Sequence, residues 1–376
     1  MKEDRKFFIN KAKRVVVKIG SKALSNGKEK ISRKIIQNLV SSISGLRKNN
    51  IEVILITSGA ILAGNEFLKI NIKNSNIIKK QVLSSLGQIK LMTIYSEFFQ
   101  KEKTRVSQLL LTNDIFQDRK RFLNARAMIL ELLKMNIVPI VNENDTVSID
   151  EIMFGDNDIL ASKVASMVDA NFLILLTDTD GLYDGNPKKN KNVNLLSMIS
   201  DDQFDRNILS DSKDNISSGG MTSKIDAALN VSKFGIPTII ANGMKKDILL
   251  KIFSFKDIGT MISPSNKSVK SRKKWIGIGL KTSGKIFVDK GAAEAIVKKG
   301  KSLLPSGIKK VEGNFEKGQQ VIIIDDSSKK NIARGLISYS SEDLTKIIGI
   351  KSSQIESVLG YKYSDEIINR DNLIVD

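Results

Sequence analysis

The stretch RVVVKI, residues 14 to 19, is the first of several short runs rich in β-branched residues that alternate with helical patterns. The later runs are EVILIT (52–57), NIVPIV (136–141), FLILLT (172–177) and IPTIIA (236–241), and TRVSQLLLT (104–112) is a candidate further strand. Between them, apolar residues recur at the three-and-four spacing of an amphipathic helix over 79–100, 122–135 and 157–169. Such alternation predicts an α/β fold with a mainly parallel open sheet sandwiched by helices.

Each of the five runs ends at a polar or glycine-rich step. The endings read KIGS, TSGA, NEND, TDTDG and ANG in chain order. In open α/β sheets the ligand crevice lies outside the carboxyl ends of the strands. We therefore expect these endings to line one crevice.

The composition and the predicted secondary structure change after residue 265. Residues 266–274, NKSVKSRKK, are basic and poor in apolar residues. Short strand-like pieces with Gly or Pro turns follow, namely WIGIGL, KIFVD, GQQVIIID and IARGLISY, and one helical pattern, AAEAIVKK (292–299), interrupts them. We predict a large domain over 1–265, a basic linker over 266–274, a small mostly-β domain over 275–360 and a C-terminal tail over 361–376.

The chain of 376 residues contains no cysteine and no histidine. This composition excludes disulfides, thiolate chemistry, most zinc sites and every histidine-based general base. Catalysis would have to use Lys, Arg, Asp, Glu, Ser, Thr, backbone amides or a bound ion. Phosphoryl transfer fits that restriction, because its transition state is stabilised chiefly by positioned positive charge and backbone donors.

The N-terminus, MKEDRKFFIN, lacks the apolar stretch of a secretory signal. The longest apolar runs, such as FLILL at 172–176, are far shorter than the roughly 20 residues that span a bilayer. We therefore expect a cytoplasmic protein with no membrane partner.

The formal net charge of +19 keeps nucleic-acid binding open as an alternative function. Residues 1–265 carry 39 basic and 28 acidic side chains, whereas residues 266–376 carry 21 and 13, so the C-terminal part is the more densely basic. A composition rich in Lys, Ile and Asn also spreads such charge without any function. RNA is thus a candidate partner of the small domain, and functionless diffuse charge is the competing interpretation.

Two segments far apart in the sequence combine glycine with a lysine. VVVKIGS (15–21) ends a buried strand with Lys18, and its glycine lets backbone amides approach an anion. SSGGMTSKIDAAL (217–229) leads two glycines into a helix that carries Lys224 and whose start resembles a capping box from Ser223 to Asp226. A glycine-rich loop that enters a helix predicts a phosphate site. A solvated lysine and an ordinary helix cap are the alternatives.

Three further stretches bear on the ligands. TSGA (57–60) is another junction between a strand and a helix, and it suits a second anion such as a substrate carboxylate. NENDTVSIDEIMFGDND (142–158) is crowded with acidic residues and asparagines, although the chain is basic elsewhere. DTDGLYDGNPKK (178–189) lacks the glycine and acid spacing of a calcium loop, and we expect no metal ion held by protein side chains.

Taken together, these motifs resemble the amino acid kinase family, and in particular its branch that phosphorylates glutamate. The shared motifs are VVVKIGS, TSGAI, RFLNAR, VPIVNEND, GDND, LLTDTDGLY and GGMTSK, in that order. The segment from Trp275 to LLPSGI, which ends at residue 308, resembles the PUA domain that follows the kinase domain in this branch. Kinases that act on other small acids share the two-lysine pattern, but NEND followed by GDND is more specific.

The resemblance implies roles for individual residues. Lys18 and Lys224 would neutralise the phosphoryl group in flight, and Asp158 would hold the two lysines in position. The residues implied in glutamate binding are Ser58, Asn142, Asp145, Asp156 and Asn157. The residues implied in ATP binding are Lys18, Thr177, Asp178, Ser218, Gly219, Gly220, Met221, Thr222, Ser223 and Lys224.

The resemblance also implies the ligands and the reaction. ATP is the co-substrate and arrives with Mg²⁺, which keeps several waters and lies mainly on phosphate oxygens. L-glutamate is the acceptor, and its product opens proline biosynthesis. The nucleophile is the γ-carboxylate, which is already ionised at neutral pH, so a histidine would have nothing to do.

Further implications concern assembly and regulation, namely a homo-oligomer, as a dimer or tetramer, and proline as a feedback inhibitor. Met153 stands where the family more often has a basic residue, and this change bears on glutamate affinity and on proline inhibition. The thirteen residues before the first strand have no assigned role. A kinase of another small amino acid, or an RNA-binding protein that acts through the PUA domain, is the alternative function.

Overall fold

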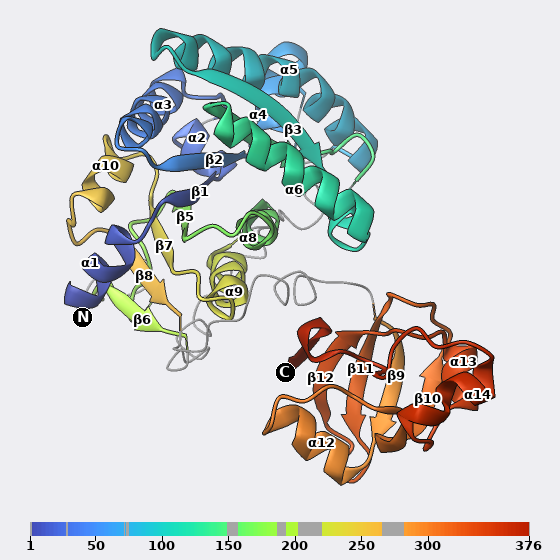
Figure 1. Ribbon diagram of the computed structural model, residues 1–376. Coiled ribbons are helices and arrows are strands. Elements are labelled where there is room, and N and C mark those ends of the chain that lie inside the picture. The colour runs from blue at the N-terminus through green and yellow to red at the C-terminus, as the bar shows by residue number, and fades with distance from the viewer. Residues whose placement is uncertain are drawn as a thin grey trace. The chain divides into compact units, whose positions relative to one another are not determined.

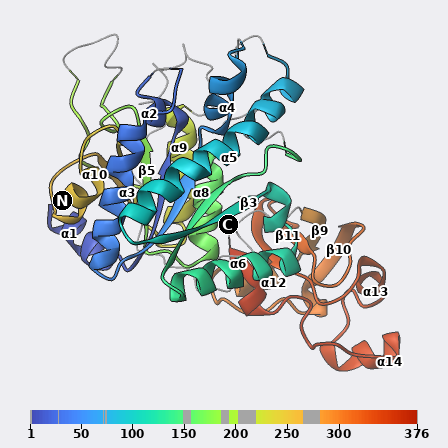
Figure 2. The same ribbon diagram turned by 90° about the horizontal axis from the view of Figure 1, so that it is seen from above.

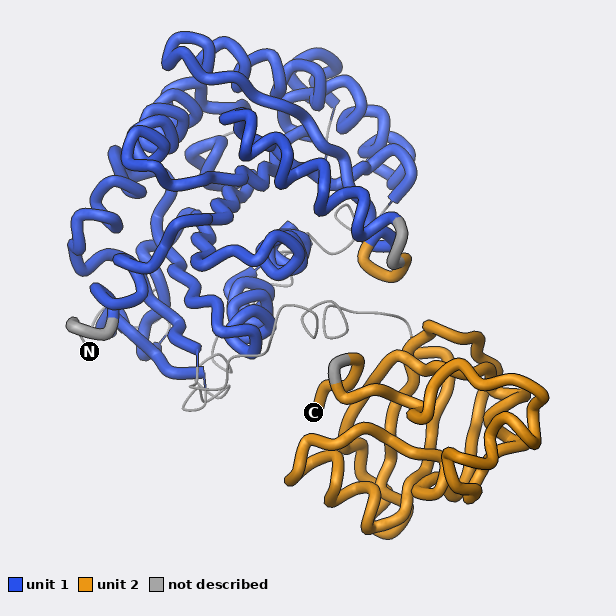
Figure 3. Tube along the Cα trace, viewed as in Figure 1, with its two compact units in different colours: residues 1–115, 119–268 blue, residues 116–118, 269–376 orange. Residues whose placement is uncertain are grey.

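The computed structural model divides into two compact units. Unit 1 comprises residues 1–115 and 119–268, and unit 2 comprises residues 116–118 and 269–376 (Figure 3). The predicted linker and the piece WIGIGL (275–280) lie outside the described residues, so the predicted domain boundaries stay a prediction. The structure describes residues 2–27, 29–70, 72, 75–148, 157–185, 193–201, 220–264 and 282–375.

Unit 1 is built on an eight-stranded sheet with the order β3-β4-β2-β1-β5-β7-β8-β6. Neighbouring strands are parallel except for β7 and β8, which confirms the predicted mainly parallel sheet. The candidate strand at 104–112 forms β3, whereas β6 and β8 were not predicted. The strands are β1 (Arg14–Ile19), β2 (Glu52–Thr57), β3 (Arg105–Leu111), β4 (Ile137–Glu143), β5 (Phe172–Thr177), β6 (Met198–Ser200), β7 (Thr238–Asn242) and β8 (Thr260–Ser263).

Helices lie on both sides of this sheet (Figures 1 and 2). The three helical patterns of the sequence form α5, α6 and α8, with ends within three residues of the predicted ones. The helices are α1 (Lys2–Asn10), α2 (Ser21–Ser25), α3 (Arg33–Lys48), α4 (Ala60–Leu68), α5 (Ile77–Lys101), α6 (Arg119–Lys134), α8 (Asn157–Met167), α9 (Met221–Ser232) and α10 (Ile248–Phe253). None of the helices in the described part of the chain is both long and apolar enough to cross a membrane.

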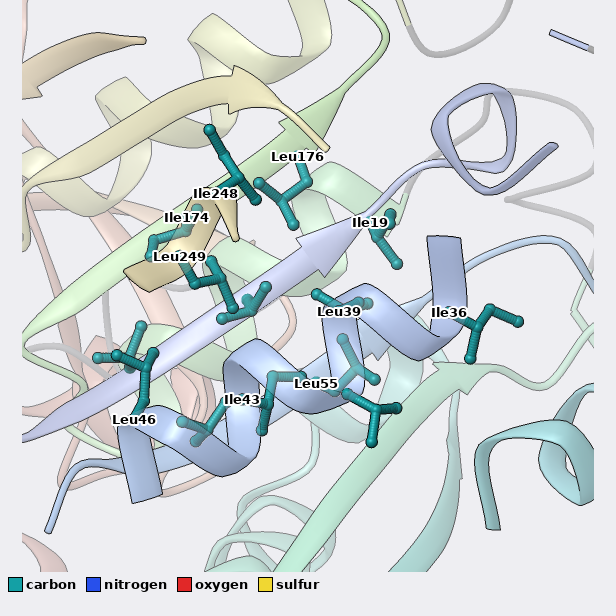
Figure 4. Close-up of a cluster of buried hydrophobic side chains, with 14 of the residues drawn as sticks. Ile19, Ile36, Leu39, Ile43, Leu46, Leu55, Ile174, Leu176, Ile248 and Leu249 are labelled. Carbon is teal, nitrogen blue, oxygen red and sulfur yellow. The ribbon is translucent and has the colours of Figure 1, made fainter. Parts of the chain in front are cut away.

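Strand β1 shows how the sequence sets the two faces of the sheet. Val15, Val17 and Ile19 belong to a buried apolar cluster that includes residues of α3 and α10 (Figure 4). Alternate side chains of a strand point to opposite faces, so Val16 and Lys18 point to the other face. Helix α8 packs along β1, and Lys18 pairs with its Asp158. Within the buried part of β1, residues 15–19, Lys18 is thus the one polar side chain, and it lies on the face that α8 covers.

Helices α4 and α5 cross with almost no space between their backbones. A Cβ atom on Gly64 would lie 1.9 Å from the carbonyl oxygen of Leu83, and one on Gly87 would lie 1.8 Å from that of Ala60. Real Cβ atoms do not approach backbone atoms so closely, so both positions require glycine. Helix α4 directly follows β2 in the chain. The close crossing therefore sets the position of α5 relative to the end of β2.

Helix α1 lies in the N-terminal stretch to which the sequence assigned no role. Its Arg5 is buried and donates hydrogen bonds to the carbonyl oxygens of Ser197 (2.6 Å), Ile258 (2.6 Å) and Gly259 (3.2 Å). Burial lowers the pKa of Arg5, and the ion pair with Asp257 at 3.0 Å opposes that shift. Arg5 therefore attaches α1 to the segments that lead into β6 and β8.

Unit 2 has a five-stranded sheet with the order β10-β9-β11-β12-β13 and its own apolar core. The pair β9–β11 is parallel and the other pairs are antiparallel. Residues 373–375 form β13, so part of the predicted C-terminal tail belongs to this sheet; its apolar run LIV completes the edge beside β12. The elements are β9 (Thr282–Val288), α12 (Lys290–Val297), β10 (Ile308–Gly313), β11 (Gln320–Asp325), β12 (Asn331–Leu336), α13 (Ser341–Lys346), α14 (Ile355–Leu359) and β13 (Leu373–Val375).

Candidate active site

Lys18, Asp158 and Lys224 meet at the carboxyl edge of the sheet. Lys18 comes from the end of β1, Asp158 from the first turn of α8 and Lys224 from the first turn of α9. Lys18 Nζ lies 2.6 Å from Asp158 Oδ1, and Lys224 Nζ lies 3.0 Å from Asp158 Oδ2. One carboxylate therefore holds two ammonium groups that are more than 200 positions apart in the sequence.

The three charges are removed from water. Asp158 is fully buried, and Lys18 and Lys224 are 4% and 5% exposed. Burial alone would raise the pKa of Asp158, but the charges and hydrogen bonds of Lys18 and Lys224 outweigh it and leave the pKa below its usual value. Burial lowers the pKa of Lys224, and the charge of Lys18 adds to that effect while Asp158 opposes it. The cluster has a net positive charge in a place where solvent screens little.

Ser223 contributes to this cluster in a way that differs from the sequence prediction. Helix α9 begins at Met221 with Gly220 as its N-cap, so Ser223 lies inside the first turn. The predicted capping box from Ser223 to Asp226 is therefore wrong. Ser223 Oγ instead has two acceptors for its single hydrogen, Asp158 Oδ2 at 2.8 Å and the carbonyl oxygen of Gly220 at 2.9 Å. The hydroxyl binds α9 to α8 directly at the carboxylate.

A chain of buried amides runs beside the cluster. Asn157 Nδ2 donates to Ser58 Oγ (2.9 Å), to the carbonyl oxygen of Thr57 (3.1 Å) and to Asn142 Oδ1 (2.9 Å). Asn142 Nδ2 in turn donates to Gln88 Oε1 at 2.9 Å. The chain joins the ends of β2 and β4 to the starts of α4 and α8 and to the middle of α5, so three predicted site residues are brought together.

Asp145 lies in the same neighbourhood, against α5. Its Oδ2 atom accepts a hydrogen bond from Ser84 Oγ, and its carbonyl oxygen accepts one from Gln81 Nε2 at 2.8 Å. Burial raises the pKa of Asp145, and the Ser84 hydrogen bond only partly offsets this shift. A buried carboxylate with a raised pKa is suited to binding a cation, because a cation would restore the stability of its ionised form.

The end of β5 forms a second polar group beside β7. Thr177 Oγ1 donates to Asp178 Oδ1 at 3.0 Å, and the carbonyl oxygen of Thr177 accepts from the amide of Gly243 at 2.8 Å. Asp180 accepts from Lys245 Nζ at 2.8 Å and from Asn242 Nδ2 at 2.9 Å. The sequence analysis implied Thr177 and Asp178 in ATP binding. The glycine-rich loop leads into a helix as expected, because Gly220 is the N-cap of α9 and Met221 to Lys224 form its first turn.

Asp156, Ser218, Gly219 and the substrate-loop residue Met153 lie outside the described residues, so their predicted roles stay predictions.

Sequence reasoning missed the α5 side chains of this site. Gln81, Ser84 and Gln88 recur at spacings of three and four, the period of one helix face. That face also carries the buried residues Leu91 and Tyr95, so the polar residues interrupt an otherwise apolar stripe. Polar residues on the buried face of a helix were the signal that could have found them.

The sheet order, the two lysines and their shared carboxylate define a class of phosphotransferase-like α/β proteins, and comparison with known sequences agrees. A sequence model of the amino acid kinase family matches residues 13–242, and one of the PUA domain matches residues 284–359. The chain belongs to the amino acid kinase family.

Within that family, the chain is similar to several curated glutamate 5-kinases. It is 45% identical to the glutamate 5-kinase of Thermoanaerobacter pseudethanolicus, over 96% of this chain and 97% of the relative. It is 41% identical to that of Geobacter sulfurreducens, over 99% of this chain and 100% of the relative. The structure of a carbamate kinase from Giardia lamblia gives a TM-score of 0.49 at 19% identity, over 68% of this chain and 100% of that chain.

Proposed function

We propose that the protein transfers the γ-phosphoryl group of ATP to the γ-carboxylate of L-glutamate, which gives ADP and L-glutamyl 5-phosphate and opens proline biosynthesis. Near full-length similarity to glutamate 5-kinases supports this proposal. The observation that carries the chemistry is the pairing of Lys18 and Lys224 with a single buried carboxylate, Asp158.

In the proposed reaction a γ-carboxylate oxygen of glutamate attacks the γ-phosphorus of ATP. The bond between that phosphorus and the bridging oxygen breaks, and its electron pair leaves with ADP. Glutamate's carboxylate is already deprotonated, so no general base is needed. Lys18 and Lys224 bind the oxygens of the migrating group, and Asp158 keeps the two ammonium groups apart at a fixed spacing. Such preorganised charge supplies most of the catalysis in phosphoryl transfer.

The amide chain and the Asp145 region form the glutamate side of the proposed site. Ser58, Asn142 and Asn157 are linked by hydrogen bonds at the ends of β2 and β4, and Asp156 precedes Asn157 in the sequence. Asp145 has the charge and the burial to bind the α-ammonium group. This side lies next to Asp158 because Asn157 and Asp158 are consecutive at the start of α8.

The nucleotide side of the proposed site combines Thr177 and Asp178 with the loop and helix start over 218–224. The free backbone amides at the start of α9 favour a phosphate there. Both oxygens of Asp158 are close to lysine ammonium groups. We therefore infer that Mg²⁺, when it arrives with ATP, is held mainly by phosphate oxygens and waters.

We also propose a homo-oligomer that is formed through unit 1. Helix α5 exposes Ile78, Val82, Leu86 and Ile89, whose spacing places them along one helix face, and Phe67 of α4 is exposed as well. Exposed apolar stripes of this kind mark protein contacts more often than free surface. We propose in addition that proline inhibits the enzyme and that the protein is cytoplasmic.

RNA binding finds no support in the charge of the described residues of the C-terminal unit. Residues 282–375 carry 15 basic and 12 acidic side chains, so the positive excess of the C-terminal part lies mainly in residues 266–281, with six basic residues and no acidic one.

A substrate panel tests the proposed function. ADP release is measured with ATP, Mg²⁺ and L-glutamate, aspartate, N-acetylglutamate, carbamate or UMP, each with and without proline. We expect turnover with L-glutamate, and a loss of about 10²- to 10³-fold in the Lys224→Ala and Lys18→Ala variants. The matched control is Lys233→Ala, which removes an exposed lysine at the end of α9 and leaves turnover unchanged. Preference for another acceptor, or normal turnover in both lysine variants, would overturn the assignment.

A further inference from the structure

Three buried polar atoms beside the amide chain have no hydrogen-bond partner among the described residues. They are the donor Gln88 Nε2 and the acceptors Asn157 Oδ1 and Asp145 Oδ1. Gln88 is 9% exposed, Asp145 is 4% exposed and Asn157 is fully buried. Leaving such an atom unpaired is unfavourable, so a set of three indicates a place for a polar ligand.

The three atoms lie close together because of how their elements meet. Ser84 and Gln88 are one turn apart on α5 and therefore share a helix face. Ser84 binds the carboxylate of Asp145, and Gln88 binds Asn142, which is bound by Asn157. Gln88 thus stands between the acid and the amides.

The hydrogen bonds also determine which atom of each terminal amide is left to bind a ligand. Gln88 Oε1 accepts from Asn142 Nδ2, so Asn142 turns its oxygen to Asn157 Nδ2. The nitrogen of Asn157 is used by Asn142, Ser58 and Thr57, which leaves its oxygen as the remaining group. The same bond leaves Gln88 with its nitrogen as the remaining group. The chain therefore presents one donor at the Gln88 end and one acceptor at the Asn157 end.

We propose that Gln88 binds the α-carboxylate of the amino-acid substrate through Nε2 and, through Oε1, orients Asn142 and Asn157. This inference rests on the proposed function. One amide donor beside two acceptors, one of them charged, matches the head group of an α-amino acid, which combines an anionic carboxylate with an ammonium donor. The α-ammonium group then lies on the side of Asp145 and Asn157, and the γ-carboxylate extends toward Lys18 and Lys224.

The test uses Gln88→Glu in the full-length protein. The variant keeps an oxygen that accepts from Asn142 but replaces the donor by a negative charge that repels a carboxylate. Loss of one hydrogen bond to a charged group corresponds to about 10- to 100-fold in affinity. We expect the KM for glutamate to rise by about that factor at pH 8 while the KM for ATP stays within about twofold. Gln100→Glu, the same change at an exposed position of α5, is the matched control and leaves both values unchanged.

Two analogues separate substrate binding from a general disturbance of the site. Glutarate lacks the ammonium group and keeps both carboxylates, whereas 4-aminobutyrate lacks the α-carboxylate. Both analogues are measured as competitive inhibitors against glutamate. In Gln88→Glu we expect the inhibition constant of glutarate to rise by the same factor as the KM for glutamate, and that of 4-aminobutyrate not to rise. In a neutral variant, Gln88→Met, we again expect weaker inhibition by glutarate and unweakened inhibition by 4-aminobutyrate, but the change for glutarate is smaller.

The outcomes are distinct. An unchanged KM for glutamate in an active Gln88→Glu enzyme, or equal weakening of both analogues, would overturn the role of Gln88 and leave the proposed function intact. A wild-type protein that does not phosphorylate glutamate would overturn both.

Discussion

Asp158 is the residue on which the proposed chemistry depends most. A carboxylate in a dry interior is unstable unless cations and donors surround it, and here Lys18, Lys224 and Ser223 all approach its two oxygens. The negative charge of Asp158 offsets the repulsion between the two lysine ammonium groups, so both can lie close to it. In the proposed reaction, the two ammonium groups would stabilise the negative charge of the phosphoryl group as it moves.

The lowered pKa of Lys224 leads to a prediction about pH. Burial favours the neutral amine, so Lys224 loses its proton at a lower pH than an ordinary lysine, whose pKa is about 10.4. The catalytic charge is present below that lowered pKa and disappears as the pH rises through it. We expect the alkaline limb of the kcat/KM profile to fall below the ordinary lysine value, and to move to higher pH in Lys224→Arg. The amino group of glutamate titrates equally in both enzymes, so an identical limb in the two profiles would argue against a role for Lys224.

At the scale of single residues, the sequence indicated the two lysines that the structure brings to Asp158, but it did not indicate their polar neighbours on α5. Lys18 and Lys224 became candidates through strand-end and glycine-rich patterns, and the resemblance to the amino acid kinase family implied their roles. Ser223 was placed in a cap because its spacing to Asp226 fits one, but the partner that it meets, Asp158, comes from another helix. Gln88 was not identified, since a glutamine in the middle of a helix carries no local signal of the tertiary neighbour that it binds.

At the scale of elements, the crossing of α4 and α5 positions the side chains of the proposed glutamate side of the site. Gly87 precedes Gln88 and follows Ser84 by three residues, so the closest backbone contact lies between the two polar contacts. Any change that separates the two helices would move both side chains away from Asp145 and Asn142.

This crossing can be tested with Gly87→Ala. The added methyl group would lie 1.8 Å from the carbonyl oxygen of Ala60, so the helices must separate. We expect the free energy of unfolding, measured with urea, to fall by about 1–3 kcal/mol, as in overpacked cores, and the KM for glutamate to rise more than that for ATP. Ser85→Ala, at an exposed position of the same helix, serves as the control. Unchanged stability would contradict the close crossing.

The strands were predicted more accurately than the helices, and for a physical reason. Strands β1, β2 and β5 have the predicted ends, because buried parallel strands are nearly continuous β-branched or apolar runs bounded by polar residues. The short strands β6 and β8 have three and four residues and no such run, and their place in the sheet depends on α1 and Arg5. Interactions across more than 190 positions of sequence are not visible in a local pattern.

At the scale of the whole molecule, the order of the strands brings distant segments to one edge. β1 lies between β2 and β5, so Lys18 near the end of β1, Ser58 just after β2 and Thr177 at the end of β5 come to the same edge of the sheet. Of the acidic stretch after β4, the described residues Asp145 and Asp158 lie buried near this edge, Asp145 against α5 and Asp158 between the two lysines. The C-terminal strand β13 could not be predicted as part of unit 2, because a run of three residues at a chain end has no periodicity to read.

The central claim is that Lys18 and Lys224 act on one phosphoryl group through one carboxylate. The most direct test is a double-mutant cycle on kcat for ADP release, with Lys18→Ala, Lys224→Ala and the combined variant. We predict that the combined variant loses little more than the more damaging single change, since either change already disrupts the shared arrangement around Asp158. Losses that multiply, as they do for independent sites, would contradict the account.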